Sequence, residues 1–125
     1  MRPIRQTKFG DPEGNCLEAC IATITGIDLA EIPHYMEGWF DAYSAWLRAR
    51  GWCVAWWEVG AGSVPPGLAI ANGPAVRGLG HSVVTCDGVL AHDPHPSGVG
   101  VLEVHSWMLL WPEDLRVREF PEVGR

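Results

Sequence analysis

The stretch "GNCLEACIATITG" (residues 14–26) places a cysteine where it could act as a nucleophile. Its apolar residues recur at helical spacing from Cys16 onward, with Asn15 as a favourable N-cap and Gly26 as a stop. The unpaired N–H groups and the dipole at a helix N-terminus stabilise a thiolate. Cys16 is therefore a candidate nucleophile. Cys20 lies one turn later on the same face, and we expect it to pack in the core.

A cysteine nucleophile needs a base and a group that orients the base, and the hairpin "HSVVTCDGVLAHD" (residues 81–93) offers both. If its loop has three residues, with Gly88 in the left-handed position of a bulge, His81 faces Asp93 on the adjacent strand. A two-residue loop would place His81 across from Pro94 and turn Asp93 to the other face. We favour the three-residue loop, which also pairs apolar residues. Directly opposed side chains are close enough for an imidazole–carboxylate hydrogen bond.

The same residue types also allow a metal site. A zinc ion could draw its four ligands from one set: Cys16, Cys20 and two of His81, His92 and His95. However, two cysteines four residues apart in one helix are not the Cys-x-x-Cys pair typical of structural zinc. His92 faces the opposite side of its strand from Asp93, and the prolines around His95 favour a turn. We therefore expect no metal and no organic cofactor.

The elements that position these residues fall into two groups. Helical patterns come first: one begins at Cys16, and two more follow, from Leu29 to Met36 with Asp28 as cap and over "GWFDAYSAWLRARG". Strand patterns come second, at residues 52–59, 68–72, 81–93 (the hairpin) and 99–107. Helices followed by an antiparallel sheet predict an α+β fold, in a single domain that spans residues 1–125.

Composition excludes several classes of partner. The 125 residues suffice for one compact core. The net charge is -6, and the nine Lys and Arg residues form no basic stripe, so we expect no nucleic-acid partner. No apolar run approaches the roughly 20 residues that cross a bilayer, and the first residues lack a secretory pattern. We therefore expect no membrane partner and a cytoplasmic location, where the four cysteines should be thiols.

The order Cys16, His81, Asp93, carried by "GNCLEACIATITG", "GHSVVTCDG" and "AHDPHPSG", resembles the papain-like cysteine peptidase clan. It looks closest to the branch of bacterial leader-peptide-cleaving (bacteriocin-processing) cysteine peptidases. The chain also looks like short proteins of bacterial and phage genomes that begin with a "QT-F--P-GNC--AC" pattern. The resemblance covers the N-terminal third and residues 80–98. It implies a minimal papain-like fold, with N-terminal helices packed on a small antiparallel sheet.

This resemblance implies a Cys–His–Asp site whose oxyanion hole combines the Cys16 N–H with the amide of Gln6, the only glutamine. Gln6 lies ten residues before Cys16, so "DPEG" must loop out to bring it close; otherwise Asn15 takes this role. The implied reaction is hydrolysis of an amide, peptide or isopeptide bond through an acyl-enzyme. The substrate would be a peptide or protein that a partner could present. The alternative is a non-enzymatic binding or inhibitory module that acts on a host or phage protein.

Overall fold

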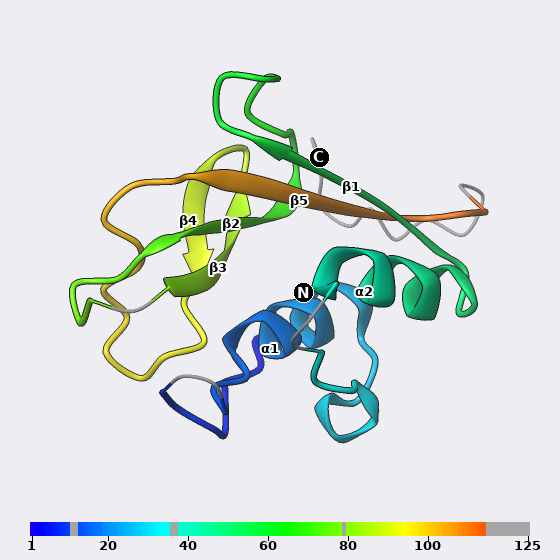
Figure 1. Cartoon of the computed structure of the whole chain (residues 1–125), viewed down its shortest axis with the longest axis horizontal. Coiled ribbons are helices and arrows are strands. Elements are labelled where there is room, and N and C mark those ends of the chain that lie inside the picture. Colours follow the sequence, from blue (N-terminus) through cyan, green and yellow to red (C-terminus); the bar gives the residue numbers. More distant parts are fainter. Residues whose placement is uncertain (11–12, 36–37, 79, 115–125) are drawn as a thin grey trace.

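The computed structural model describes residues 1–10, 13–35, 38–78 and 80–114 (Figure 1). Within these residues two α-helices and a short 3₁₀ turn come first: α1 (Cys16–Thr25), η1 (Leu29–Glu31) and α2 (Trp39–Arg48). The strands follow: β1 (Trp52–Glu58), β2 (Leu68–Pro74), β3 (Gly80–Cys86), β4 (Val89–His92) and β5 (Ser106–Pro112). They form one antiparallel sheet. The α+β prediction is therefore confirmed.

The sheet has the strand order β1-β5-β2-β3-β4. β5, the last strand described, pairs with both β1 and β2 and so joins the two halves of the sheet. Both helices cover the same face, with α1 against β3 and α2 against β1 (Figure 1). This arrangement places the N-terminus of α1 beside β3, the strand that begins with Gly80 and His81.

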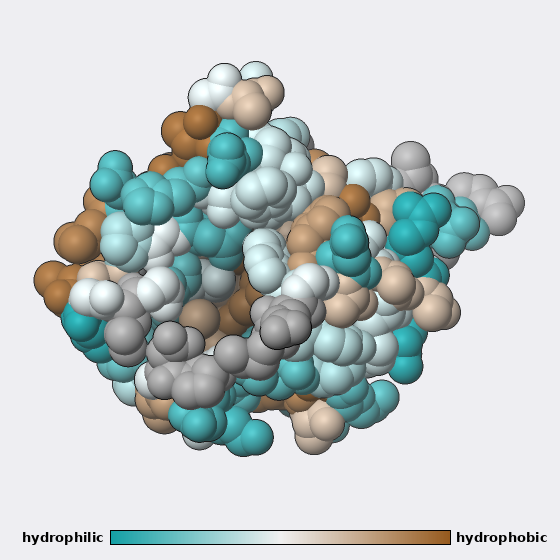
Figure 2. All heavy atoms as spheres, viewed as in Figure 1, coloured by the Kyte–Doolittle hydropathy of each residue, from teal (hydrophilic) through white to brown (hydrophobic). Residues whose placement is uncertain are grey.

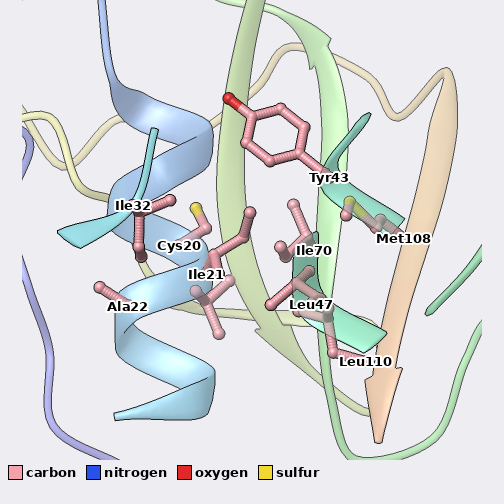
Figure 3. Close-up of a cluster of buried hydrophobic side chains, with 10 residues drawn as sticks. Cys20, Ile21, Ala22, Ile32, Tyr43, Leu47, Ile70, Met108 and Leu110 are labelled. Atoms are coloured by element: carbon pink, nitrogen blue, oxygen red, sulfur yellow. The ribbon is translucent and has the colours of Figure 1, made fainter. Parts of the chain in front are cut away.

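The main core lies between the two helices and this face of the sheet (Figure 3). Its buried members come from both helices, from the residue after η1 and from three strands: Cys20, Ile21, Ala22, Ile32, Tyr43, Leu47, Ile70, Val84, Met108 and Leu110. Cys20 is fully buried among them, as the sequence predicts. A smaller cluster of Ala71, Val83 and Trp107 covers the other face, since successive residues of a strand point to opposite sides.

Two predicted elements differ from the structure. The helix predicted from Leu29 is only the 3₁₀ turn η1, which ends before Pro33, although Asp28 caps it by accepting from the Ala30 N–H at 3.1 Å. Its predicted end at Met36 lies outside the described residues. Proline removes a backbone donor and restricts the residue before it, so the pattern could not continue as a helix.

The strand predicted at residues 99–107 is also wrong over most of its length, because β5 begins only at Ser106. Gly98 and Gly100 have φ values of 67° and 83°, and such left-handed residues interrupt an extended run. The chain then crosses the end of β2, where the Leu102 N–H donates to Pro74 O at 2.8 Å. No helix in the described part of the chain is long and apolar enough to cross a membrane.

Candidate active site

The hairpin between β3 and β4 has a two-residue loop, so the three-residue loop favoured from the sequence is wrong. Cys86 pairs directly with Val89, and the loop residues Asp87 and Gly88 have φ values of 52° and 85°. Two left-handed residues are typical of the tight turn that matches the twist of the flanking strands. The Asp87 carboxylate is also fixed by the Gly67 N–H, which donates to it at 2.7 Å.

A β-bulge nevertheless restores the predicted partnership of His81 and Asp93. Thr85 pairs with Leu90, but the next pair is Val84 with His92, so Ala91 is an extra residue in β4. A one-residue shift turns the following side chains to the opposite face of the sheet. Asp93 therefore returns to the side of His81, by a route that the sequence did not indicate.

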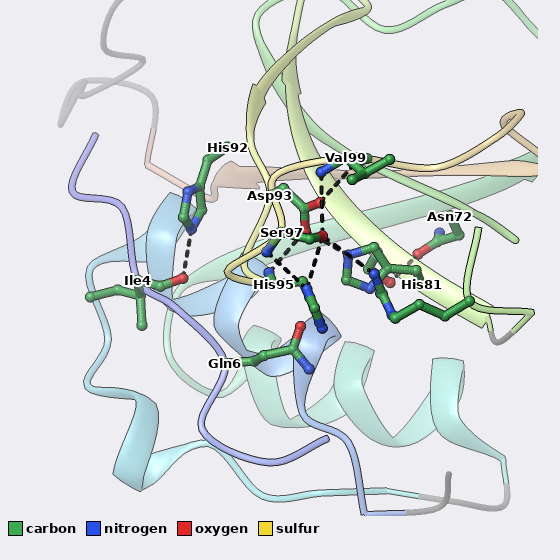
Figure 4. Close-up of polar contacts among 12 residues, drawn as sticks. Ile4, Gln6, Asn72, His81, His92, Asp93, His95, Ser97 and Val99 are labelled. Carbon is green, nitrogen blue, oxygen red and sulfur yellow. Dashed lines mark hydrogen bonds and ion pairs between the residues drawn. The ribbon is translucent and has the colours of Figure 1, made fainter. Parts of the chain in front are cut away.

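His81 and Asp93 form a buried hydrogen-bonded pair, with 2.6 Å between Nε2 and Oδ1 (Figure 4). Both side chains are 2% exposed. The N–H groups of His95 and Gly100 also donate to the Asp93 carboxylate, at 2.9 and 2.7 Å. Burial acts to raise the pKa of Asp93, but the hydrogen bonds from His81, His95 and Gly100 outweigh it and lower the pKa below its usual value. Asp93 contacts Nε2 of His81, so Nδ1 is the ring nitrogen that remains for another partner.

Cys16 is the first residue of α1 and is partly exposed. Burial raises the pKa of its thiol, and the charge of Glu18 adds to this effect. The N–H and hydroxyl of Ser82 and the N–H of Leu17 lower the pKa but do not outweigh burial. The Leu17 N–H at the start of α1 thus acts in the predicted direction, but burial outweighs it, and the pKa of the thiol lies above its usual value. Cys16 needs a base to ionise near neutral pH.

Cys16 lies against Ser82, the residue that follows His81 in β3. Among the described residues, however, the hydrogen bonds do not include one between the Cys16 sulfur and His81. Leu17 and His81 line one pocket of about 440 Å³. Figure 2 shows the molecule hollowed between α1 and the sheet. The structure thus gathers Cys16, His81 and Asp93 at one end of β3 and joins only the last two directly.

Gln6 lies beside this group through its backbone, since its N–H donates to Pro94 O at 3.0 Å (Figure 4). Its side chain is buried, and Nε2 donates to Lys8 O at 2.9 Å. Its Oε1 is buried and has no hydrogen-bond partner among the residues that the structure describes. Gln6 therefore reaches the neighbourhood of the candidate site with one amide hydrogen uncommitted.

The described residues on either side of Asp11 and Pro12 lie close together, which is what Gln6 requires to approach the helix. Gly14 N–H donates to Gly10 O at 2.7 Å, and Asn15 N–H donates to Lys8 O at 3.2 Å. The chain on either side of the loop is thereby drawn together at the start of α1. Asp11 and Pro12, the middle of the predicted loop, lie outside the described residues.

Asn15 holds the N-terminal segment in place. Its Oδ1 accepts from the N–H groups of Thr7 and Lys8, both at 2.9 Å, and its Nδ2 donates to Thr7 Oγ1 at 3.0 Å. Its side chain makes no capping bond to α1, so the predicted cap is wrong in that respect. Asn15, like Gln6, keeps one amide hydrogen uncommitted, but three bonds to Thr7 and Lys8 fix its amide on the N-terminal segment, so it is the weaker of the two candidates for an oxyanion donor.

The four-ligand zinc set is not assembled. His92 lies away from the cysteines, and its Nε2 contacts Ile4 O at 2.7 Å (Figure 4). Cys20 is fully buried in the core. Within the ranges that the structure describes, no group of three or more His, Cys, Asp or Glu side chains is placed to hold a metal ion.

Three contributors to this site were not identified from the sequence: Ser82, the Gly100 N–H and the structural role of His95. Ser82 could have been noticed as a polar residue in a strand that is otherwise apolar. Gly100 acts through its backbone, which residue type does not reveal. Comparison of the chain with protein-family models, with curated proteins and with solved structures found no match.

Proposed function

We propose that this chain is a cysteine hydrolase that cleaves an amide, peptide or isopeptide bond through an acyl-enzyme on Cys16. The observation that carries the proposal is the buried His81–Asp93 pair beside the N-terminus of α1. A thiol whose pKa is raised by burial needs such a base. The contact with Asp93 occupies Nε2, so Nδ1 of His81 is the nitrogen that can accept the proton of Cys16.

The reaction would proceed in two halves. Nδ1 of His81 takes the thiol proton, and the sulfur of Cys16 attacks the carbonyl carbon. The C–N bond then breaks, and the leaving amine takes the proton from Nδ1, which leaves a thioester on Cys16. Water next gives a proton to His81 and attacks the thioester carbon; the C–S bond breaks, and the proton returns to the sulfur. Asp93 holds the imidazole and stabilises its cationic form throughout.

Substrate contacts would come from three sources. The Cys16 N–H and the uncommitted amide hydrogen of Gln6 would donate to the oxyanion. The adjoining pocket has apolar walls from Leu17 and Trp39, which suit a peptide or protein side chain. A chain of 125 residues would benefit from a partner protein that presents the substrate. The proposed reaction uses only side-chain and backbone groups of the chain. We also propose that the fold is related to that of papain-like cysteine peptidases.

We also propose that the protein works in the cytoplasm. The cysteines Cys16, Cys20, Cys53 and Cys86 are all free thiols, although Cys16, Cys53 and Cys86 are partly exposed. Accessible thiols persist where the compartment is reducing. The absence of a basic footprint in a chain of net charge -6 supports a peptide or protein partner over a nucleic acid.

A binding or inhibitory module is the second candidate function, and one observation favours it. Nε2 of Gln6 already donates to Lys8 O, and Cys16 and His81 are not hydrogen-bonded in the described part of the chain. A fold kept for its shape would tolerate both features. A hydrolase requires that substrate binding brings the thiol and the imidazole within hydrogen-bond reach, and free enzymes often show longer separations.

The test is to trap the thioester. The full chain would be incubated with a library of peptide amides and activated peptide esters, quenched in acid and mapped by mass spectrometry. The proposal expects an acyl group on Cys16, formed slowly or not at all in His81→Ala and absent in Cys16→Ala. Peptides bound tightly without any acylation of Cys16 would support the binding module instead.

A further inference from the structure

A row of three polar residues crosses the sheet beside Cys16. Ser82 in β3 pairs with Asn72 in β2, and Asn72 pairs with Ser106 in β5. Their side chains are joined: Ser82 Oγ donates to Asn72 Oδ1 at 2.6 Å, and Asn72 Nδ2 donates to Ser106 Oγ at 3.2 Å. All three residues line the pocket that also contains Leu17 and His81. We call Ser82, Asn72 and Ser106 the polar row.

The polar row faces α1 and adjoins the main core. Two positions along the same strands, the corresponding row is Val84, Ile70 and Met108, and each of these side chains is fully buried. Residues two apart in a strand share a face, so the polar row continues this apolar row toward the pocket. Buried polar groups cost stability unless they are hydrogen-bonded. Their placement here, next to a candidate nucleophile, points to a role in the chemistry.

The two distances orient the amide of Asn72. A separation of 2.6 Å suits an O–H···O bond and is short for an N–H···O bond, whereas 3.2 Å suits N–H···O. The carbonyl oxygen of Asn72 therefore faces Ser82. Because that oxygen can only accept, the hydroxyl proton of Ser82 is committed to Asn72 and is not donated to Cys16.

We propose that Ser82 is a catalytic residue whose hydroxyl donates to the Cys16 thiolate, and that Asn72 is a positioning residue that competes for the same proton. The inference rests on the proposed function, in which Cys16 must ionise. While Cys16 is a thiol, the Ser82 proton lies on Asn72 Oδ1. When Nδ1 of His81 takes the thiol proton, the hydroxyl turns and exchanges its O–H···O bond for an O–H···S⁻ bond. Ser82 lies in the strand that packs against α1 and lines the same pocket as Leu17, and its N–H and hydroxyl both lower the pKa of the Cys16 thiol.

Other titratable groups act on Cys16 or lie around the adjoining pocket, and substitutions in the polar row leave their residue types unchanged. Glu18 and Cys20 of α1 act on Cys16 directly. His81 and His105 line the adjoining pocket, Asp93 and His95 lie around His81, and Arg77 lies near His95. A change in the ionisation of Cys16 on mutation of Ser82 or Asn72 therefore reports on the polar row itself.

The experiment measures the alkylation of Cys16 by iodoacetamide in the full chain across pH, with the adduct mapped by mass spectrometry. The sulfur displaces iodide, so the rate follows the thiolate. In Ser82→Ala we expect the half-maximal pH to rise and the rate at pH 7 to fall about tenfold, the loss of one hydrogen bond to a charged group. Ser82→Thr keeps the hydroxyl, and we expect it to stay within about twofold of the wild type.

Asn72→Ala carries the opposite expectation. It frees the Ser82 hydroxyl, so the half-maximal pH should fall and the rate at pH 7 should rise several-fold. A purely structural role would lower the rate in both variants, and that outcome would overturn the proposal, as would an unchanged pH profile in Ser82→Ala. Should Asn72→Ala fail to fold, Ser106→Ala loosens the Asn72 amide and should raise the rate by a smaller factor; no rise in a folded Ser106→Ala protein would overturn it.

The two proposals fail separately. If Cys16 never carries an acyl group from any peptide, the hydrolase proposal fails, whereas the opposite effects of Ser82→Ala and Asn72→Ala on alkylation would still stand. If the thioester forms in a His81-dependent way but Ser82→Ala leaves the pH profile of Cys16 alkylation unchanged, the hydrolase proposal stands and the proposed role of the polar row is wrong.

Discussion

Two histidine–carboxylate pairs lie near the first turn of α1, and their contact distances are almost equal. His81 Nε2 lies 2.6 Å from Asp93, and His34 Nδ1 lies 2.7 Å from Glu18. Both carboxylates are buried. The side chain of His81 is only 2% exposed, however, whereas that of His34 is 39% exposed. The distance within a pair therefore does not distinguish the candidate site from a structural contact.

The surroundings of the two pairs make the distinction. Asp93 accepts its other hydrogen bonds from backbone N–H groups. Its partner His81 directly precedes Ser82 in β3, and Ser82 contacts Cys16. Glu18 instead accepts a hydrogen bond from the hydroxyl of Tyr43 in α2. Burial and the nearby Glu18 both raise the pKa of this tyrosine. In our proposal the Asp93 pair serves Cys16, whereas the Glu18 pair links α1 to α2. A buried pair has catalytic use only where a reactive group lies within reach of its second nitrogen.

The largest expected effect separates the two carboxylates directly. Asp93→Asn should slow acylation of Cys16 by about 10²-fold or more, since the amide no longer fixes the imidazole as an acceptor at Nδ1. Glu18→Gln should leave the acylation rate within a few-fold of the wild type, or raise it, because it removes a charge that raises the pKa of Cys16. Rates of thioester formation measured by quenched mass spectrometry check both variants. Equal losses in the two would erase the distinction between the pairs.

Substitution of Gln6 should give the next largest effect on acylation, and it concerns only the candidate site around the His81–Asp93 pair. Gln6→Leu should slow acylation by about 10²-fold through loss of an oxyanion donor, but it should leave alkylation by iodoacetamide nearly unchanged, because alkylation develops no oxyanion. Asn15→Ala serves as the matched variant, and its effect should appear as lower stability of the segment that it anchors. If Gln6→Leu acylates at the wild-type rate, Gln6 is not the donor.

The free energy of unfolding should respond mainly to changes in the His34–Glu18 pair and its partner Tyr43. Glu18→Ala leaves the hydroxyl of buried Tyr43 without its acceptor, so we expect the free energy of unfolding to fall by about 2–3 kcal/mol. Tyr43→Phe keeps the ring and removes one bond, and it should cost about 1 kcal/mol. Urea unfolding followed by tryptophan fluorescence measures both. A loss of less than about 0.5 kcal/mol in Glu18→Ala would show that this pair is not a structural tie.

The smallest effect is on acid stability. The pKa of Asp93 is lower in the folded chain than in the unfolded one. Its contribution to stability is therefore complete above the unfolded value of about 3.9 and is lost as the pH falls through the lower folded value. Between pH 5 and pH 2 we expect the free energy of unfolding to fall less in Asp93→Asn than in the wild type. Urea unfolding at each pH would measure the difference. If the free energy of unfolding depended on pH in the same way in both proteins, the direction of this pKa shift would be contradicted.

Much of the fold was predictable from the sequence, because hydrophobic period and turn residues act locally. The patterns from Cys16 and over residues 38–51 correspond to α1 and α2, and the strand pattern at residues 52–59 corresponds to β1. The predictions failed where one residue changed the backbone. Pro33 shortened the second helix to η1, and Gly100 turned the chain away from the strand predicted at residues 99–107.

The candidate site was predictable in its residues but not in its geometry. The pairing of His81 with Asp93 follows from a bulge at Ala91 in β4, and nothing in the residue types indicates where a bulge falls. The raised pKa of Cys16 depends on how deeply the thiol is buried, which only tertiary packing decides. Ser82 acts through both its backbone and its hydroxyl, so its role became visible only with the fold.

The most direct test compares the reactivity of all four thiols. The full chain would be treated with iodoacetamide at pH 7, and the labelling rates of Cys16, Cys20, Cys53 and Cys86 would be resolved by mass spectrometry in the wild type and in His81→Ala. The partly exposed Cys53 and Cys86 are internal controls. We expect Cys16 to react fastest and to lose that advantage in His81→Ala, with the controls unchanged. A Cys16 that reacts no faster than Cys53 and Cys86, or that keeps its rate without His81, would contradict the proposed nucleophile and its base.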